Sequence, residues 1–261
     1  MATDARFCWT ELSTTDKEKA ERFYSRLFGW EVVPQPLWTR SGLSIDYTLL
    51  RIRGQNVGGM YPLVGGQRKQ GTPPRWLSYV FVEDAASTAR RAEALGASVL
   101  AGPLDVFDLG RLSILRDPEG VLFGTWQAIR LGSEFQARNQ PGCASWFEHV
   151  SADVPRASRF YASLFGWSRR SSDQESGERV LLEQAGVAVA GFRSRAHSTG
   201  TLSPQWLTFF QAEDCDATCQ KVASQQGSVI ASPIDAPHSA RLAVVSDPQG
   251  AAFGLLTPDR P

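Results

Sequence analysis

Two periods of hydrophobic residues alternate along this chain. A period of two over residues 6–13 predicts a β-strand, and a period of three to four over 16–28 predicts an amphipathic helix that buries an aromatic stripe on a sheet. Several short strands follow, and the rhythm starts again with a strand at 76–82 and a helix at 85–95. This alternation of strands with single amphipathic helices predicts an α+β fold.

Short local signals mark the ends of these elements. Thr15 stands three residues before Glu18, which is the spacing of a capping box, and Gly29 suits the C-terminal end of the first helix. Residues 117–120 and 247–250 both read Asp-Pro-x-Gly, in which proline fixes φ and glycine supplies a positive φ. We therefore expect a tight turn before the last strand of each half.

The whole pattern occurs twice. Residues 9–30 recur as 146–167 with eleven of twenty-two positions identical, and similar pairs continue as far as 111–124 and 241–254. The second copy lacks residues in two segments, which we expect to be loops. The repeat predicts two domains: residues 1–130, then a polar linker containing glycine and proline (131–142), then residues 143–261.

Composition removes several functions. The 27 basic residues balance the 27 acidic ones and no run of like charges occurs, so nucleic acid is not an expected partner. No apolar segment has the length of a signal peptide core or a membrane span, which predicts a cytoplasmic protein without a membrane partner. The four cysteines show no paired metal-site spacing and are interpreted as reduced packing residues.

Three features occur once in each copy: a strand leading to an Asp and an FYxxLFGW helix end, a central strand followed by Glu-Asp and a helix, and the DPxG turn. Together they resemble the vicinal oxygen chelate superfamily, which includes glyoxalases, bleomycin-resistance proteins and extradiol dioxygenases. The resemblance covers nearly the whole chain. It implies two tandem domains, each of two βαβββ modules whose strands curve into an open cup with the helices outside.

In metal-dependent members of that superfamily, four strand positions point ligands into each cup. The resemblance maps these positions onto Trp9, Gly58 or Gly59, Leu77 and Gly124 in the first copy, and onto Trp146, Ala190 or Gly191, Leu207 and Gly254 in the second. None of these residues carries an imidazole, carboxylate or thiolate donor. We therefore predict that neither cup holds a metal, and no cofactor is expected.

Strand alternation places Trp9 with Glu11, and Trp146 with Glu148, on one face of each leading strand. One interpretation is a stacking platform beside a carboxylate that accepts a hydrogen bond or acts as a catalytic general base. In the other interpretation, each Trp fills the space that a metal leaves and each Glu pairs with an Arg.

The same alternation identifies further residues of the cup walls. These are Leu77, Tyr79 and Phe81 in the first cup and Leu207, Phe209 and Gln211 in the second. Trp76 and Trp206 should turn toward the helices. Such a lining suits a small hydrophobic or aromatic molecule held by few polar groups.

Other polar residues are weaker candidates. Arg111 and Arg241 either form plain ion pairs with the Glu residues or meet an anionic substituent. His149 should lie on the helix-facing side of its strand, and His197 and His238 fall in loop-like stretches, where a solvated histidine is the usual case.

The leading hypothesis from the sequence is a metal-independent small-molecule binding protein, either a monomer or a homodimer. The alternative is an enzyme: a lyase or isomerase that uses Glu11 or Glu148 as base, or a glyoxalase- or dioxygenase-like enzyme whose metal ligands were not identified. Antibiotic sequestration of the bleomycin-resistance kind is disfavoured, because a cationic ligand favours an acidic protein and this one is neutral.

Overall fold

The computed structural model describes residues 5–38, 44–130, 134–172, 179–197, 202–236 and 240–258. The elements of the first repeat are β1 (Phe7–Thr14), α1 (Lys17–Phe28), β2 (Glu31–Pro34), β3 (Leu37–Trp38), β4 (Ser44–Ile45), β5 (Thr48–Ile52), β6 (Gln55–Pro62), α2 (Gly65–Lys69), β7 (Arg75–Phe81), α3 (Ala85–Ala94), β8 (Ser98–Val106), β9 (Gly110–Arg116) and β10 (Leu122–Ala128).

The second repeat has the same order of elements with fewer insertions. Its elements are β11 (Ala144–Ser151), α4 (Val154–Phe165), β12 (Ser168–Ser172), β13 (Arg179–Gln184), β14 (Val187–Ser194), the 3₁₀ turn η1 (Arg195–His197), β15 (Gln205–Gln211), α5 (Cys215–Ser224), β16 (Ser228–Ala236), β17 (Ala240–Ser246) and β18 (Ala252–Pro258).

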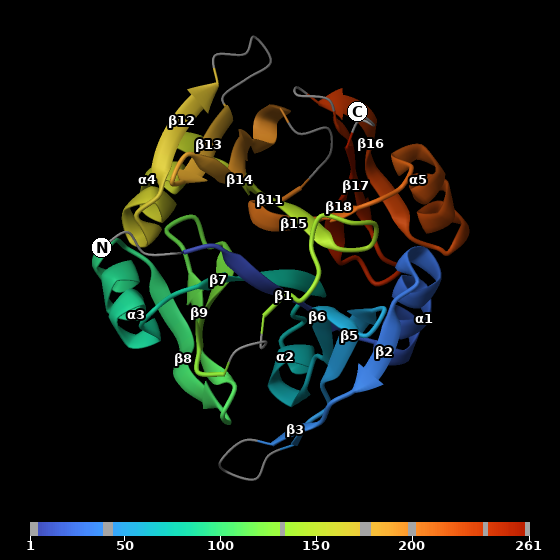
Figure 1. The fold of residues 1–261 in the computed structure, drawn as a ribbon, viewed down its shortest axis with the longest axis horizontal. Coiled ribbons are helices and arrows are strands. Elements are labelled where there is room, and N and C mark those ends of the chain that lie inside the picture. The colour runs from blue at the N-terminus through green and yellow to red at the C-terminus, as the bar shows by residue number, and fades with distance from the viewer. Residues whose placement is uncertain are drawn as a thin grey trace. The chain divides into compact units, whose positions relative to one another are not determined.

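Each repeat forms one open eight-stranded sheet (Figure 1). The strand orders are β2-β5-β6-β1-β7-β10-β9-β8 and β12-β13-β14-β11-β15-β18-β17-β16. The leading strands of the two modules, β1 and β7 or β11 and β15, are therefore neighbours at the centre of each sheet, and each module runs outward from them. This architecture confirms the predicted α+β fold of two tandem domains, each with two βαβββ modules.

Two local expectations were wrong. The first inserted segment, expected to be a loop, contains the two-stranded ribbon β3–β4. The N-cap of α1 is Asp16 rather than Thr15: a carboxylate oxygen of Asp16 accepts a hydrogen bond from the backbone N–H of Lys19, while the Thr15 hydroxyl donates to Gln249. Gly29 ends the helix as expected, with a left-handed φ of 72° that favours glycine.

The described chain separates into two compact units, and each unit takes segments from both repeats. Unit 1 comprises the described residues of Met1–Trp9, Leu77–Glu134 and Phe147–Leu207, and unit 2 those of Thr10–Trp76, Phe135–Trp146 and Thr208–Pro261. Each unit thus joins a module of one repeat to a module of the other. The domain boundaries predicted from the repeat (1–130, 131–142 and 143–261) stay a prediction.

Aromatic contacts show how a unit is held together. In unit 1, α3 and α4 lie side by side (Figure 1), and Phe123 of β10 packs edge-to-face against Phe160 and Tyr161 of α4. In unit 2, Phe253 of β18 contacts Phe23 and Tyr24 of α1. The aromatic stripe of each FYxxLFGW helix therefore packs on a strand from the other repeat, besides contacts within its own repeat.

The Asp of each DPxG turn joins the two repeats within a unit. In unit 2, one carboxylate oxygen of Asp247 accepts from the backbone N–H groups of Gln249 and Ala251, and the other accepts from the Tyr24 hydroxyl at 3.1 Å. Trp76 donates its indole N–H to the same hydroxyl at 2.9 Å. Burial raises the pKa of Tyr24 well above its usual value and also raises the pKa of Asp247.

Unit 1 contains the corresponding chain of hydrogen bonds with one addition. Tyr161 donates to Asp117 at 3.0 Å and accepts from Trp206 at 2.8 Å. The Nε2 atom of His149 lies 3.1 Å from the same Asp117 oxygen. Leu12 stands at the position of His149 in the other repeat. His149 is fully buried on the helix-facing side of β11, as the sequence predicts.

The variable residue of each DPxG turn caps the helix of the other repeat. Glu119 accepts hydrogen bonds from the Ser151 hydroxyl and the Asp153 backbone N–H just before α4. Gln249 accepts from the Asp16 backbone N–H and donates to the Asp16 carbonyl just before α1. These contacts join each DPxG turn to the start of the first helix of the other repeat.

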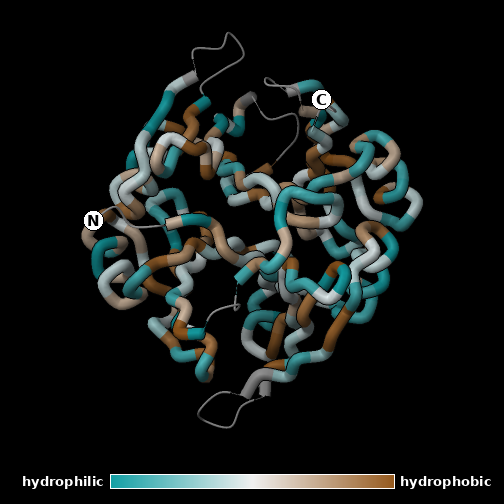
Figure 2. The backbone as a smooth tube through the Cα atoms, in the orientation of Figure 1, coloured by the Kyte–Doolittle hydropathy of each residue, from teal (hydrophilic) through white to brown (hydrophobic). Residues whose placement is uncertain are grey.

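No helix in the described part of the chain is long and apolar enough to cross a membrane. Figure 2 shows short hydrophobic stretches interrupted by hydrophilic residues along the helices and strands.

Candidate functional site

An apolar cluster in unit 1 contains the residues predicted to line the first cup. Leu77 and Tyr79 of β7 are buried beside Trp126 and Cys8, and Trp9 and Phe81 pack against this group from partly buried positions. Trp76, which directly precedes Leu77 on β7, points the other way and donates to Tyr24 on α1. The face of β7 opposite the helix is therefore apolar and aromatic, and we refer to this side of each sheet as the cup face.

Aromatic rings cover the glycines that end each cup face. The Tyr79 ring lies against Gly124, and the Phe209 ring lies against Gly254, so closely that a methyl group on either glycine would overlap the ring. At Gly59 the Tyr47 hydroxyl occupies the corresponding space. Glycine is required at these positions because another group already fills the volume of a side chain.

Glu11 lies among hydroxyl groups in unit 2. It is half-buried on β1, opposite Gly59 of β6, and accepts a hydrogen bond from the Tyr47 hydroxyl at 3.0 Å. Burial and the negative charge of Glu11 raise the pKa of Tyr61, and the nearby Arg75 acts in the opposite direction. One phenol thus donates to the Glu11 carboxylate, and a second phenol is near enough for the charge of that carboxylate to raise its pKa.

Glu148 has different neighbours in unit 1. It is buried on β11, opposite Gly191 of β14. Its Oε1 atom lies 2.6 Å from Nε of Arg193, and its Oε2 atom lies 3.8 Å from Nη2 of Arg179. Pairing with arginine, which was one of the two interpretations for both Glu residues, thus describes Glu148, whereas Glu11 accepts from a tyrosine.

The remaining candidates of the second repeat lie in both units. Leu207, in unit 1, and Phe209, in unit 2, are buried. Trp146 and Gln211, both in unit 2, are half-buried, and the Gln211 side chain accepts from the Ser145 hydroxyl at 3.4 Å. The four predicted residues of the first cup, Trp9, Leu77, Tyr79 and Phe81, thus lie together in one cluster of unit 1. Those of the second cup are divided between the two units, with Leu207 in unit 1 and the other three in unit 2.

The weaker candidates have structural partners. Arg111 pairs with Asp105 at 2.7 Å, and Arg241 pairs with Asp216 and Asp235. Their ion-pair partners among the described residues are aspartates rather than the Glu residues considered from the sequence. The His197 side chain and all of His238 lie outside the described residues.

The four cysteines are buried and form no disulfide. Burial raises the pKa of Cys143 to about 11, which disfavours the reactive thiolate. The burial of all four side chains supports the interpretation of the cysteines as packing residues.

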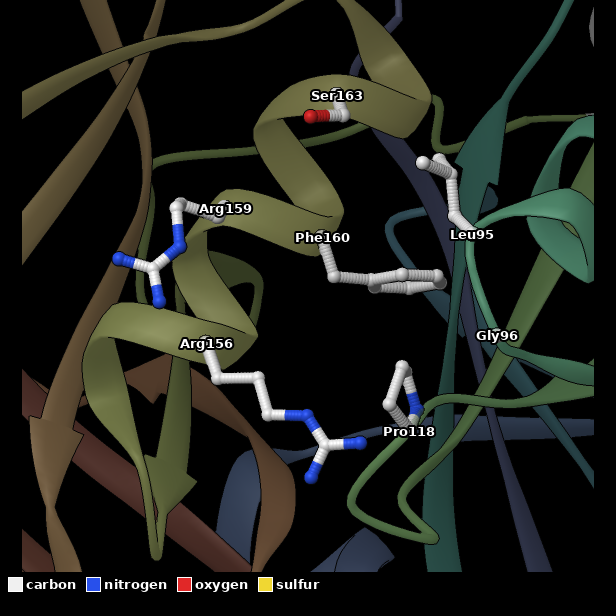
Figure 3. A pocket seen from close by; sticks show the side chains of 7 residues that line it. All are labelled: Leu95, Gly96, Pro118, Arg156, Arg159, Phe160 and Ser163. Carbon is white, nitrogen blue, oxygen red and sulfur yellow. The ribbon is translucent and has the colours of Figure 1, made fainter.

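A small hollow lies on the helix side of unit 1, away from the cup face (Figure 3). It has a volume of about 230 Å³ and lies between α4, the end of α3 and the turn at Pro118. Phe160 points toward Leu95 in it, and the Arg156 guanidinium lies toward Pro118. Both of its arginines, Arg156 and Arg159, are exposed, so this hollow lacks the enclosed polar groups of a binding site.

Both halves of the chain match models of one superfamily. Residues 9–125 match the glyoxalase-like domain, and residues 145–255 match the glyoxalase/bleomycin resistance protein/dioxygenase superfamily. A Mycobacterium tuberculosis protein with the provisional name glyoxylase CFP32 is 34% identical over 251 residues, which cover 96% of this chain and 94% of that protein. The chain belongs to the glyoxalase/bleomycin resistance protein/dioxygenase superfamily.

Other members of this superfamily resemble the chain in sequence or fold. The anthracycline biosynthesis protein DauV from a Streptomyces species is 31% identical, and the match covers 95% of this chain and 91% of DauV. A Mn(II)-bound glyoxalase from Novosphingobium aromaticivorans has a TM-score of 0.66 at 13% identity, covering 97% of this chain and 81% of that one. An extradiol ring-cleaving dioxygenase from B. fuscum has a TM-score of 0.65 at 16% identity, covering 99% and 73%.

The metal of the metal-dependent superfamily members does not fit the residues present here. Of the eight mapped positions, Gly59, Gly124 and Gly254 are covered by the Tyr47 hydroxyl and two aromatic rings, and the others carry no donor side chain. Within the described ranges, no three His, Cys, Asp or Glu side chains come together as a metal site.

Sequence reasoning missed the polar partners of the two Glu residues, which are Tyr47, Tyr61, Arg179 and Arg193. A signal for them was present. The repeat alignment of 49–60 with 181–192 has an offset of 132, and extending it by one or two residues at either end pairs Tyr47 with Arg179 and Tyr61 with Arg193. In both repeats these positions share a cup face with the Glu.

Proposed function

We propose that the chain is a metal-independent small-molecule binding protein whose cup faces take flat hydrophobic or aromatic molecules. The observation that carries this proposal is the pair of aromatic rings, Tyr79 and Phe209, over Gly124 and Gly254. The resemblance to metal-dependent members of the superfamily maps a metal-ligand position onto each of these two glycines. Here the volume holds a ring, and an apolar wall replaces a coordination site.

The proposed ligand contacts are the cup-face residues predicted from strand alternation. They are Trp9, Leu77, Tyr79 and Phe81 in the first cup and Trp146, Leu207, Phe209 and Gln211 in the second. Two relatives are named anthracycline biosynthesis proteins, which makes flat fused-ring compounds the first ligands to screen. The chain is proposed to act in the cytoplasm as a monomer or homodimer, with neither nucleic acid nor membrane as a partner.

A catalytic function is the second candidate, and one observation favours it. Glu11 is half-buried, and the Tyr47 hydroxyl donates a hydrogen bond to its carboxylate. A carboxylate in such surroundings can serve as a general base for a lyase or isomerase. Glu148 suits this role less, because two arginines contact its carboxylate.

Calorimetric titration with a hydroxyanthraquinone and with 1-naphthamide tests the binding proposal. Trp9→Phe and Trp146→Phe keep most of the packing volume, and at least one should weaken binding by roughly 1 kcal/mol or more, about fivefold to tenfold. Trp76→Phe is the matched control, because Trp76 lies on the helix side of the same sheet; it should lower stability and leave affinity unchanged. Absence of binding, or binding that neither cup variant alters, would contradict the proposal.

Turnover measurements separate the two candidate functions. Glu11→Gln keeps the shape and one acceptor oxygen but cannot take up a proton at neutral pH. An enzyme that uses Glu11 as its base should lose at least about a hundredfold in turnover while substrate affinity survives. Unchanged turnover of a bound substrate would leave the binding function alone.

A further inference from the structure

The strand registers place the two Glu residues at equivalent positions of the two sheets, and we call the strand residues paired around each Glu its frame. Glu11 is opposite Gly59, and Glu148 is opposite Gly191. Next along each sheet, Leu49 pairs with Gly59 and Leu181 pairs with Gly191. Any difference in chemistry between the two cup faces must therefore come from the residues around this shared frame.

The residues flanking the frame differ in charge. Two positions after the glycine, the first repeat has Tyr61 and the second has Arg193, on the same face as the Glu because strand side chains alternate. Two positions before the leucine, the first repeat has Tyr47 and the second has Arg179, which pairs directly with Arg193 in the β13–β14 register. Two phenols are thus replaced by two guanidinium groups.

The second repeat accordingly carries an excess of positive charge at this face. Among the described residues around the frame, Glu148 contributes −1 and the two arginines contribute +2, which leaves +1. In the first repeat Glu11 and Arg75 cancel, and Gln205 stands at the position of Arg75 in the second. The side chains of Glu148 and Arg193 are only 6% and 12% exposed, whereas Arg179, which carries the additional positive charge, is 28% exposed.

The contact between Arg193 and Glu148 leaves hydrogen-bonding capacity unused. Nε of Arg193 and Oε1 of Glu148 are at ion-pair distance, but their orientation does not give a hydrogen bond, and neither atom has another hydrogen-bond partner among the described residues. Arg179 is 28% exposed and reaches Glu148 only at 3.8 Å. Buried charge without full compensation is costly, and a second carboxylate would relieve that cost.

The geometry points to the Glu148 side of β13 and β14, within unit 1, as a site for an aromatic carboxylate, with Arg179 and Arg193 binding the carboxylate and Glu148 positioning Arg193. The guanidinium group suits this ligand because its N–H groups match the two carboxylate oxygens. The first-repeat cup, with Tyr47 and Tyr61, has no such preference. This inference rests on the proposed binding function and adds the charge of the ligand to it.

The test compares two probes of nearly equal shape, 1-naphthoate and the uncharged 1-naphthamide, by calorimetric titration at pH 7 and low salt. Wild-type protein should bind naphthoate at least about tenfold more tightly than naphthamide. Arg193→Met and Arg179→Met should each remove most of that preference while the affinity for naphthamide stays within about twofold. Tyr61→Phe, at the position of Arg193 in the first repeat, is the matched control and should retain the preference.

Because Arg193→Met leaves Glu148 with a single arginine, the double variant Glu148→Gln/Arg193→Met is measured beside it, with near-ultraviolet circular dichroism as a check of folding. Equal affinity for the two probes in wild type, or a preference that survives both arginine variants, would overturn the inference and leave the binding proposal standing. If neither probe binds at millimolar concentration, the proposal of aromatic binding fails, and the inference fails with it.

Discussion

The hydrogen bonds between each FYxxLFGW helix and the DPxG turn of the other repeat allow a quantitative test. Tyr24→Phe removes one buried hydroxyl, which donates to Asp247 and accepts from Trp76. A hydrogen bond to a charged group contributes about 1.5–3 kcal/mol, and leaving a buried donor unsatisfied costs about 1–3 kcal/mol. Since the two effects overlap, we expect a loss of about 3–5 kcal/mol in the free energy of unfolding.

The equivalent change in unit 1 should cost less. After Tyr161→Phe, His149 still contacts the same Asp117 oxygen, so only the indole of Trp206 loses its partner fully. The expected loss is about 2–3 kcal/mol. The difference between the two variants follows from one substitution between the repeats, His149 in place of Leu12.

A double-mutant cycle isolates that difference. In a His149→Leu background the side-chain hydrogen bonds around Asp117 match those around Asp247, so Tyr161→Phe should then cost about as much as Tyr24→Phe. Urea unfolding at pH 7, followed by tryptophan fluorescence and circular dichroism, measures each free energy. Equal costs of Tyr24→Phe and Tyr161→Phe in the parent chain, with no coupling to position 149, would refute the assigned role of the histidine. Losses below about 1 kcal/mol would refute the whole network.

Three further outcomes follow from the fold. Gly124→Ala places a methyl group against the Tyr79 ring and should lower the free energy of unfolding by about 1–3 kcal/mol in thermal unfolding. Gly66 has open space around it, so Gly66→Ala should change stability by no more than about 0.5 kcal/mol. Equal effects of the two changes would contradict the close packing at Gly124. Gln249→Ala removes the hydrogen bonds to the Asp16 backbone before α1 and should lower the free energy of unfolding in urea by about 1 kcal/mol. An unchanged free energy of unfolding would indicate that water replaces the amide. Burial raises the pKa of Asp247, so stabilisation by its protonated form is present below the unfolded value of about 3.9 and is lost as pH rises through the native value. Asp247→Asn should therefore gain stability relative to wild type as pH rises above that unfolded value, and a constant difference between their free energies of unfolding would contradict this linkage.

The sequence predicted the features that depend on local pattern. Helix α1 and its end at Gly29 follow from hydrophobic spacing and from one left-handed residue. The opposite orientations of Trp76 and Leu77 follow from strand alternation alone. The N-cap was placed one residue early, because the hydroxyl of Thr15 is taken by Gln249, a residue 234 positions away.

What the sequence did not reveal depends on contacts between distant segments. The Asp of DPxG was interpreted only as a turn residue, yet Asp117 accepts from Tyr161, 44 positions later. No periodicity predicts such a pairing. The sequence did not predict the different surroundings of Glu11 and Glu148 either. Arg193 of β14 contacts Glu148 of the neighbouring strand β11, and alternation along a strand does not determine the register between two strands.

The composition of the two compact units has a consequence for how this chain can be divided. A fragment that stops within 131–142 would contain Tyr24 without Asp247, and Asp117 without Tyr161. A second copy of the fragment could replace both contacts only by pairing Tyr24 of one copy with Asp117 of the other, in a homodimer. In the 261-residue chain the second repeat supplies Asp247 and Tyr161, so each repeat provides the partner residues that the other needs. Substitutions on the cup faces can then accumulate in one repeat at a time, while the Tyr–Asp junctions restrain both.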